Sequence, residues 1–369
     1  MRVLYFLDSV GRGGAEMQAL DVCRNAERFG IEMTFATARG GHLETDFRTS
    51  GVDFIRLDRK FPLDLYLISN LRRIIKENKI EIVHGYQAVD GLHLYLASRG
   101  LRHVKRVMSF QGFVPDRKNR LTLKYLIPRF HANLSVSNSL SEWLAAVDGL
   151  NTADFKVLYN GADPNRLAPA GRSIRKELSI PAEHLLLGMV ANFYRDPRKD
   201  QLTICRALPR VMANIPELQF VFAGGIEPGA EDKMAECLQI CIDNGIDDRV
   251  HFVGARSDVP DILADLDIFV FSSLHEGLPV AVTEAMLAGV PIIHSDIGPL
   301  MEATDNGKLA AVFPVGDHQR LGDLMIELAR DTNRRSELAA AAKAHAIENF
   351  SIEAHMARLV EIYNKVISA

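Results

Sequence analysis

The sequence predicts an α/β protein made of two consecutive doubly wound, Rossmann-like domains that face each other across a cleft. Short β-rich runs alternate with longer helical stretches, which is typical of parallel sheets covered by helices. The alternation occurs twice, and 369 residues are enough for about two domains. Open sheets of this kind bind ligands at the carboxyl ends of their strands, so we expect an active site between the two sheets.

The first series of elements occupies residues 1–165. Its strands are short and apolar, whereas the stretches between them carry apolar residues at helical spacing. We expect strands at Arg2–Leu7, Glu32–Thr37, Asp53–Arg56, Ile82–His84, Arg106–Phe110 and Ala132–Val136. We expect helices at Ala15–Phe29, Leu65–Asn78, Gly91–Arg99 and Ser139–Ala146.

The second series follows a turn at 160–164, and beyond residue 317 the pattern is helical only. We expect strands at Leu185–Val190, Gln219–Ala223, Val250–Val253, Ile268–Ser272 and Pro291–His294. We expect helices at Asp200–Asn214, Ala230–Asn244, Val259–Leu263, Val280–Ala288, His318–Asp331, Asn333–Asn349 and Ile352–Ile367. The last helix is amphipathic, and we expect it to cross back to the first domain. The predicted domains are therefore 1–165 together with 352–369, and 166–351.

Composition and charge exclude several classes of protein. The 43 Lys and Arg nearly balance the 47 Asp and Glu, which excludes a disordered chain and a strongly basic nucleic-acid-binding protein. Lys and Arg exceed Asp and Glu in residues 1–165 (23 against 18), while acidic residues dominate the remainder, so the halves should meet different partners. No apolar run approaches the roughly 20 residues that span a bilayer, and the apolar run at the start is too short for a signal peptide. We therefore expect a soluble, cytoplasmic protein.

The sequence predicts neither a metal site nor a cofactor. Cys237 and Cys241 are four residues apart in a predicted helix and could share a face as zinc ligands, but no second ligand pair has suitable spacing. Buried free thiols in a reducing compartment are the expectation. Asp265 and Asp267 form a D-x-D of the kind that holds a divalent metal in some sugar transferases. They precede a buried strand rather than follow one, so we interpret them as its solvated start.

The segment 268–291 combines an apolar strand, a loop and a helix that Gly289 should end. The amides of Gly277, Leu278 and Val280 would converge at the helix N-terminus, where an anion is favoured, and Pro279 would be the first helical residue. Glu284 is the only ionisable residue of that helix, and a buried carboxylate needs a partner. The hydroxyls of a ligand could be this partner. The alternative is that Glu284 pairs with a neighbouring arginine and that the loop only connects the strand to the helix.

Two further segments could bind phosphate. The turn Gly11-Arg12-Gly13-Gly14-Ala15-Glu16 follows the first strand and opens a helix, but it lacks the spacing of a dinucleotide fingerprint. The loop 192–200 brings Arg195, Arg198 and Lys199 to the end of the first strand of the second domain, which would suit a diphosphate. The alternative for the glycine-rich segment is a plain tight turn, and the alternative for the loop 192–200 is a solvated charged loop.

The combination of motifs resembles the retaining glycosyltransferases of family 4 (glycosyl transferases group 1), which have the GT-B fold. Glu276 and Glu284 form an E-x7-E within Glu-Gly-Leu-Pro…Glu-Ala-Met-Leu-Ala-Gly-Val-Pro, and the Gly13–Glu16 turn accompanies it. The resemblance covers nearly the whole chain. Further matching segments, in the order of the family, are 135–139, 159–163, 222–225 and 250–254.

The resemblance implies transfer of a sugar from a nucleotide-diphosphate donor, UDP- or GDP-linked, with retention and without an essential metal. The first domain would bind the acceptor and the second the donor. Glu284 would bind the ribose, Glu276 the sugar hydroxyls and the developing oxocarbenium charge, and Lys199 the leaving diphosphate. Gly277 and Leu278 would hold the diphosphate through their amides, Gly14 would let it approach, and Gly254 would lie near the base. Glu276 and Lys199 are the predicted catalytic residues, and no protein nucleophile is implied.

Two positions depart from the family pattern. Gln111 stands where a histidine is common and cannot act as a base, and Phe193 stands where an arginine is common, six residues before Lys199. Arg195 is preferred to Arg198 as the second phosphate cation. The predicted acceptor-binding residues are Gly13, His84, which would point into the cleft from a strand end, and Gln111. A structural role is the alternative for His84 and the expectation for His275 and His294.

The stretch 102–129 is basic, with eight Lys and Arg opposed only by Asp116, and it contains apolar residues such as Phe113 and Tyr125. Such a stretch could rest on an anionic membrane and serve a lipid-linked acceptor. The alternative is a solvated segment that meets a soluble anionic acceptor.

The leading hypothesis is a transferase that moves a hexose or an N-acetylhexosamine onto a cell-envelope glycan or its lipid-linked precursor. A nucleotide-cofactor oxidoreductase would need a G-x-G-x-x-G, which neither domain has at the required spacing. A non-catalytic sugar-nucleotide-binding protein is a further hypothesis, motivated by Gln111 and Phe193. A nucleotide-sugar epimerase on the same fold is the last.

Overall fold

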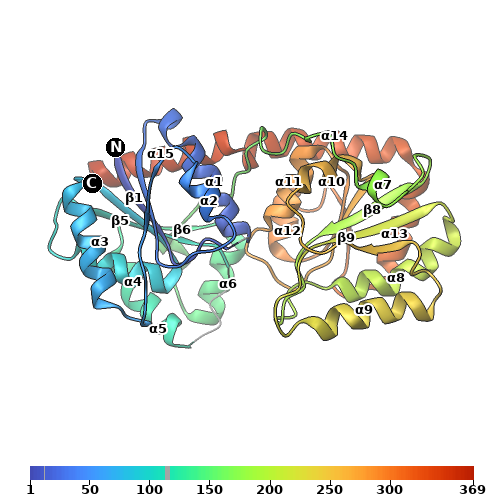
Figure 1. The fold of residues 1–369 in the computed structure, drawn as a ribbon, viewed down its shortest axis with the longest axis horizontal. Helices are drawn as coiled ribbons and strands as arrows, with labels where there is room; N and C mark the ends of the chain where they lie inside the picture. Colours follow the sequence, from blue (N-terminus) through green and yellow to red (C-terminus); the bar gives the residue numbers. More distant parts are fainter. Residues whose placement is uncertain (12, 113–116) are drawn as a thin grey trace. The chain divides into compact units, whose positions relative to one another are not determined.

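The structure is a computed structural model that describes residues 1–11, 13–112 and 117–369 (Figure 1). Arg12 of the glycine-rich turn, and Phe113 and Asp116 of the basic stretch, lie outside the described residues. The chain divides into two compact units. One unit consists of Met1–Gly161 together with Ile352–Ala369, and the other of Ala162–Ser351. The acceptor and donor roles predicted for two domains stay predictions.

The first unit contains a parallel sheet of seven strands among the described residues, in the order β3-β2-β1-β4-β5-β6-β7. The strands are β1 (Arg2–Leu7), β2 (Glu32–Thr37), β3 (Asp53–Arg56), β4 (Ile82–Tyr86), β5 (Lys105–Phe110), β6 (Ala132–Ser135) and β7 (Phe155–Val157). The α-helices are α1 (Gly14–Asn25), α2 (Glu44–Arg48), α3 (Leu65–Glu77), α4 (Gln87–Ser98), α5 (Arg117–Leu126), α6 (Asn138–Asp148) and α15 (Ile352–Ser368).

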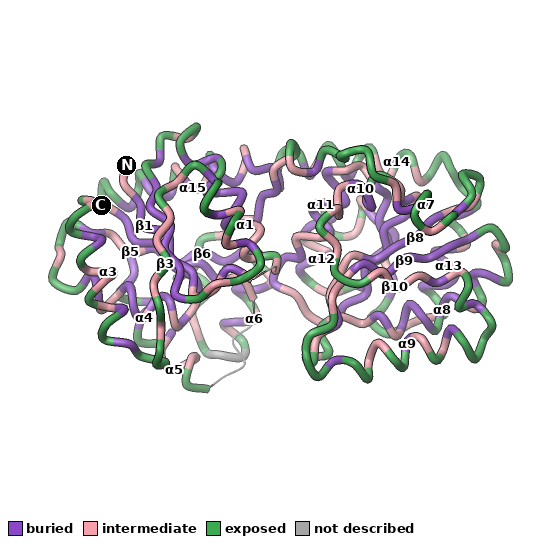
Figure 2. The backbone as a smooth tube through the Cα atoms, viewed as in Figure 1, coloured by how far each residue is buried: buried purple, intermediate pink, exposed green. Residues whose placement is uncertain are grey.

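Helices cover both faces of this sheet (Figure 1). One core cluster combines side chains of β1 and β2 with those of α1 and α15, and the other combines β1 and β4 with α3 and α4. Met356, Leu359 and Tyr363 of α15 are fully buried in the first cluster, because the amphipathic pattern of α15 places them on one face. The C-terminal helix is therefore part of the core of the unit formed mainly by residues 1–161 (Figure 2).

The second unit contains a parallel sheet of six strands among the described residues, in the order β10-β9-β8-β11-β12-β13. The strands are β8 (Leu185–Val190), β9 (Leu218–Ala223), β10 (Val250–Phe252), β11 (Ile268–Phe271), β12 (Ile292–Ser295) and β13 (Ala311–Phe313). The helices are α7 (Ile174–Glu177), α8 (Gln201–Asn214), α9 (Glu231–Asp243), α10 (Val259–Asp265), α11 (Val280–Ala288), α12 (Gly298–Ala303), α13 (His318–Arg330) and α14 (Thr332–Phe350).

In each sheet the strand order reverses at one place, between β1 and β4 in the first and between β8 and β11 in the second. The register pairs Ile268 of β11 with Leu187 of β8. Because the two strands are parallel, the loops that follow them leave the sheet at the same edge. Such a switch point is where open α/β sheets form ligand sites.

The two Rossmann-like parallel sheets confirm the predicted fold class. Several short elements were not predicted: β7 and β13 have three residues each, and α2, α7 and α12 have four to six. Such segments are too short for a hydrophobic period to emerge. The single helix predicted at Ala15–Phe29 is wrong in detail, because α1 ends at Asn25 and a separate 3₁₀ turn spans Glu27–Phe29.

Candidate active site

The loops after β8 and β11 are joined by backbone hydrogen bonds. Lys199 and Ser273 form an isolated antiparallel bridge. On either side of it, Asp200 N donates to Ser272 O at 3.1 Å and Leu274 N donates to Arg198 O at 2.8 Å. The sequence spacing predicts each loop separately, but this pairing brings their side chains together.

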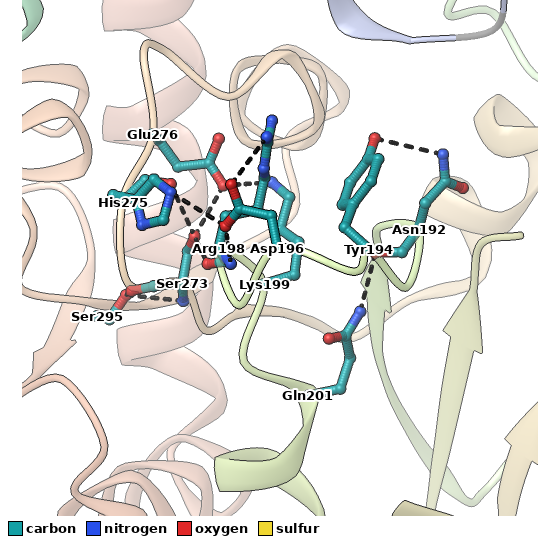
Figure 3. A network of polar contacts seen from close by, with 10 residues as sticks. All are labelled: Asn192, Tyr194, Asp196, Arg198, Lys199, Gln201, Ser273, His275, Glu276 and Ser295. Atoms are coloured by element: carbon teal, nitrogen blue, oxygen red, sulfur yellow. Dashed lines mark hydrogen bonds and ion pairs between the residues drawn. The ribbon is translucent and has the colours of Figure 1, made fainter. Parts of the chain in front are cut away.

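Lys199 and Glu276 form an ion pair at this junction (Figure 3). Each side chain is only 11% exposed. The Lys199 ammonium also lies 4.2 Å from the centre of the Phe271 ring. The two residues predicted to be catalytic are therefore in contact, and both belong to the second unit.

The surroundings of this pair are polar on one side and apolar on the other. The Ser273 hydroxyl lies 2.7 Å from Glu276 Oε1 and 2.5 Å from the Arg198 carbonyl oxygen, so its single proton can be donated to either acceptor. Burial lowers the pKa of Lys199, and the neighbouring Glu276 carboxylate opposes this shift. A buried ammonium beside a carboxylate can offset the charge of an anion while the carboxylate accepts hydrogen bonds from hydroxyls.

Three side chains hold the two loops in place. Ser295, at the end of β12, donates its hydroxyl to Ser273 O at 2.8 Å and accepts from Ser273 N at 3.1 Å. Asp200 caps α8 by accepting from Thr203 N, and it also accepts from the Ser272 hydroxyl at 3.1 Å. These contacts were not predicted, since serine residues at strand ends give no spacing signal.

The rim of the site contains a second charged group. Asp196 pairs with Arg198 at 3.1 Å and lies 3.3 Å from His275 Nε2 (Figure 3). Arg198 lies over the Tyr194 ring at 5.1 Å. Burial favours a higher pKa for Asp196, but Arg198 and His275 outweigh it and the pKa is lowered.

Arg195, the preferred second phosphate cation, is exposed and belongs to a different set of contacts. Its backbone N donates to Glu227 at 2.8 Å, and its side chain lies against Gly229, where a Cβ would approach Arg195 Cδ to 3.1 Å. The backbone of Arg198, by contrast, is bonded to the loop that carries Glu276. The assignment of Arg195 to phosphate stays a prediction.

Glu284 on α11 is 6% exposed, and its Oε1 accepts from Arg166 Nη2 at 2.6 Å. The arginine alternative for this carboxylate is therefore what the structure contains. Arg166 was not predicted, because it lies 118 residues earlier in the chain. A carboxylate has about four acceptor positions and can bind several donors at once.

The loop before α11 is buried from Gly277 to Pro279. The expected first helical residue is wrong by one: Pro279 is the N-cap in extended conformation, and the helix begins at Val280. Gly289 ends the helix in the left-handed region, at φ +80°, as predicted.

Phe193 follows β8 and Gly254 follows β10, two strands of the same sheet. Phe193 is 3% exposed and packs against Phe252, with 6.3 Å between ring centres, so its side chain belongs to the core. Gly254 has φ +66°, and its carbonyl oxygen accepts from Gly224 N at 2.8 Å. A Cβ on Gly254 would meet no atom within 4 Å, which leaves this backbone open to a ligand.

In the first unit, the N-terminus of α1 is occupied by a side chain of the helix itself. Gly13 is the N-cap and Gly14 the first helical residue. A Cβ on Gly13 would lie 2.6 Å from Glu16 Oε2, so the carboxylate lies against this turn. Burial raises the pKa of Glu16, while backbone hydrogen bonds from Glu16 and Gly13 oppose the shift.

His84 is buried in the core of the first unit and does not point into an open site. Its Nδ1 lies 2.6 Å from the Tyr363 hydroxyl and its Nε2 lies 2.8 Å from Ser109 Oγ. Burial lowers its pKa to about 3. The expectation that His84 would reach a ligand is therefore corrected in favour of the structural alternative. Gln111 accepts from Asn160 Nδ2 at 2.9 Å.

The remaining candidates have structural contacts. His294 is bonded to Ser295 O and Thr304 and has a pKa lowered by burial to about 4. Asp267 pairs with Arg175 at 2.6 Å, and Asp265 accepts from the Ser173 hydroxyl. Across residues 1–11, 13–112 and 117–369, no three His, Cys, Asp or Glu side chains are arranged to hold a metal ion. All four cysteines are buried and free.

Two family models match the chain. One, described as glycosyl transferases group 1, matches residues 184–331, and the other, described as glycosyltransferase family 4, matches residues 12–166. The first contains the Lys199–Glu276 pair and Glu284, and the second contains the glycine-rich turn from Arg12 onward. The predicted resemblance is confirmed.

Individual proteins are similar over most of the chain. N-acetyl-alpha-D-glucosaminyl L-malate synthase of Bacillus anthracis is 24% identical, covering 92% of this chain and 93% of its own. An alpha-1,3-galactosyltransferase of Escherichia coli that is named for UDP-Gal and alpha-D-GlcNAc-diphosphoundecaprenol is 27% identical over 63% of this chain and 62% of its own. HepE of Anabaena, solved in complex with UDP, superimposes with a TM-score of 0.86 at 21% identity, covering 99% of this chain and 100% of HepE. The last likeness supports the GT-B fold.

Proposed function

The chain belongs to the group 1, family 4 glycosyltransferases, and from that premise we propose that it transfers a hexose or an N-acetylhexosamine from a nucleotide-diphosphate sugar. The observation that carries the proposal is the buried Lys199–Glu276 pair at the switch point of the second sheet. It combines a cation for a departing diphosphate with a carboxylate for sugar hydroxyls. The UDP complex of HepE and the UDP-Gal named for the E. coli relative support a UDP-linked donor, and a GDP-linked donor is the alternative.

In the proposed donor complex, Lys199 faces the diphosphate and Glu276 accepts hydrogen bonds from the sugar. The amides of Gly277 and Leu278 bind phosphate oxygens at the start of α11. Glu284 accepts the ribose hydroxyls while Arg166 stays bonded to its carboxylate. Gly254, with its open backbone, lies beside the base.

The proposed reaction proceeds with retention and without a metal ion. The acceptor attacks from the face that the diphosphate leaves, and a phosphate oxygen takes the acceptor proton. Lys199 stabilises the negative charge that grows on the diphosphate, and Glu276 stabilises the positive charge that grows on the sugar ring. Both effects are strongest where water is excluded, as at this pair.

The proposed acceptor is a cell-envelope glycan or its lipid-linked precursor. The diphosphoundecaprenol-linked acceptor named for the E. coli relative supports a lipid-linked acceptor. Gly13, Gly14 and Gln111 are the proposed contacts in the first unit. The membrane contact proposed for 102–129 is centred on α5, which exposes Arg117, Lys118 and Lys124. No helix among the described residues is long and apolar enough to cross a bilayer.

The proposal is tested by nucleotide binding followed by turnover. We expect UDP or GDP to raise the melting temperature, with about 2.7 kcal/mol of stabilisation at 100 times the dissociation constant. E276Q, which keeps the shape of the side chain, should lower turnover of the matching nucleotide sugar about 100-fold. Turnover here includes transfer and acceptor-free donor hydrolysis.

The matched control is D305N, which removes the carboxylate of the exposed Lys308–Asp305 pair. It should leave turnover unchanged, because exposed pairs contribute little. Full turnover by E276Q, or the absence of any stabilisation by nucleoside diphosphates, would contradict the proposal. Nucleotide binding without turnover in the wild type would favour a non-catalytic sugar-nucleotide-binding protein.

A further inference from the structure

The segment between β3 and α3 exposes large apolar side chains. Phe61 is 65% exposed, Leu63 48%, Leu65 76% and Tyr66 71%. These four lie within six consecutive residues, whereas the other strongly exposed apolar side chains of the described residues are singles or pairs. Figure 2 shows the chain as largely exposed where β3 leads into the partly buried helix α3. Concentrated apolar exposure of this kind marks an interaction site.

The backbone of this segment is held by buried polar side chains. Asp64 is 5% exposed and accepts from the backbone N of Lys60 at 2.8 Å, of Tyr66 at 2.9 Å and of Leu67 at 3.1 Å. Asp64 N in turn donates to His93 Nε2 at 3.2 Å. Hydrogen bonds therefore fix the backbone of this loop, and its apolar side chains face the solvent.

Arg59 also helps to fix the backbone of the loop. It forms two hydrogen bonds with Asp8, at 2.6 and 2.8 Å, and its Nη1 lies 3.4 Å from the carbonyl oxygens of Phe61 and Pro62. Several backbone donors and acceptors of the loop are thus paired internally. Moving the loop into a less polar medium therefore leaves few backbone groups to be desolvated without a partner.

Charges on the neighbouring helix indicate the partner. Helix α4 packs against both α3 and α5, and the chain between β3 and α3 lies at the same end of the first unit as α5 in Figure 1. The exposed face of α5 carries Arg117, Lys118 and Lys124 beside Leu121 and Tyr125, which are 60% and 47% exposed. Aromatic and aliphatic side chains flanked by cations fit a surface that is apolar below and anionic above. An anionic lipid bilayer has this arrangement. A second copy of this chain does not fit, because the two basic surfaces would repel each other.

We propose that Phe61, Leu63, Leu65 and Tyr66 insert into the interface of a bilayer containing anionic lipid, while the cations of α5 lie over its headgroups. The loop supplies the apolar contact, and α5 supplies the salt-dependent attraction. The membrane contact of α5 is part of the proposed function, on which this inference rests, and the apolar loop 61–66 is the contact added to it. The binding itself requires neither a donor nor transfer.

The test is co-sedimentation of the full chain with vesicles of equal phosphatidylglycerol and phosphatidylcholine, and with vesicles of phosphatidylcholine alone. We expect binding to the anionic vesicles that weakens with salt, and partitioning that falls at least about tenfold in F61S/L65S. I347S is the matched control: Ile347 is 53% exposed on α14, in the second unit, and its replacement should change partitioning by less than about twofold.

Three results would overturn the proposal: no wild-type binding to anionic vesicles at low salt, equal binding by F61S/L65S, or an equal loss in I347S. Loss of a dimer in F61S/L65S by gel filtration, with no vesicle binding by the wild type, would assign the loop to a second copy instead. A melting temperature of F61S/L65S equal to that of the wild type excludes unfolding as the cause. Unchanged acceptor-free donor hydrolysis by this variant separates the result from the proposed function.

Discussion

Two buried carboxylates of the second unit are each paired with a cation. Glu276 is paired with Lys199 and Glu284 with Arg166, and all four side chains are at most 16% exposed. Removing one partner of a buried pair leaves an uncompensated charge, which costs more than the pair contributes to stability. The Arg166 guanidinium therefore holds the Glu284 carboxylate in place on a helix that is largely apolar. That makes Arg166 a positioning residue for the proposed ribose contact.

We predict that R166Q raises the KM for the nucleotide sugar about tenfold and changes kcat less. The expected factor corresponds to ~1.4 kcal/mol, about the contribution of a hydrogen bond between charged groups. R166K should restore part of the affinity, because it restores the charge without the planar fork. Steady-state kinetics with varied donor provides the measurement.

The control for this prediction is R175Q. Arg175 pairs with Asp267 at the same 2.6 Å and is also 16% exposed, but it belongs to α7 and contacts the start of β11 rather than Glu284. R175Q should lower stability without raising the KM. If R166Q behaves in the same way as R175Q, the arginine has only a structural role.

At the scale of elements, short backbone features position the site. The Lys199–Ser273 bridge joins two loops, Pro279 precedes α11, and Gly289 ends it. Gly289 has φ +80°, a conformation that L side chains rarely adopt, and a Cβ there would lie 3.3 Å from Lys343 Cδ. Gly322 differs: it lies inside α13, and a Cβ there would make ordinary contacts at 3.7 Å or more.

We predict opposite effects on stability for alanine at these two glycines. G289A should lower the free energy of unfolding by about 1 kcal/mol, because alanine is strained in the left-handed region. G322A should raise it by about 0.5–1 kcal/mol through helix propensity and a less flexible unfolded chain. Urea unfolding measures both. Equal effects of the two substitutions would show that backbone conformation is not the deciding factor.

At the scale of the whole molecule, three buried histidines link stability to pH. Burial lowers the pKa of His84 to about 3 and those of His294 and His355 to about 4. The unfolded chain protonates its histidines below about pH 6.5, while the folded chain keeps these three neutral. The unfolded state therefore binds more protons between those values, and stability falls as pH falls. Glu16 and Asp90, whose pKa burial raises, act in the opposite sense.

We predict that replacing one of these histidines removes its contribution to the pH dependence of the free energy of unfolding. Between pH 6 and pH 5, the free energy of unfolding of H294Q should fall less steeply than that of the wild type, by about 1 kcal/mol per pH unit. Urea unfolding at several pH values gives both slopes, and the difference isolates His294 from the other groups. Parallel slopes would mean that this histidine is protonated in the folded state.

The sequence alone predicted the features that depend on short-range patterns, namely the boundaries of strands and helices and the family motifs. The strands β1, β2, β3 and β8 begin and end at the predicted residues, and Gly289 ends α11 as predicted, because apolar runs and glycine boundaries are local signals. The E-x7-E spacing and the glycine-rich turn were enough to predict the family. The carboxylates of the candidate site could thus be named, and their roles in binding stay predictions.

The partners of those residues were decided only by the tertiary structure. Arg166 and Glu284 are 118 residues apart, and His84 and Tyr363 are 279 residues apart. Neither contact follows from a period of two or 3.6 residues, because each depends on which elements the sheet order brings together. For the same reason a single sequence predicted His84 as an acceptor contact, whereas the packing of α15 on β4 encloses it and satisfies both ring nitrogens. Spacing along the chain determines which groups are available, and the packing of distant elements determines which of them meet.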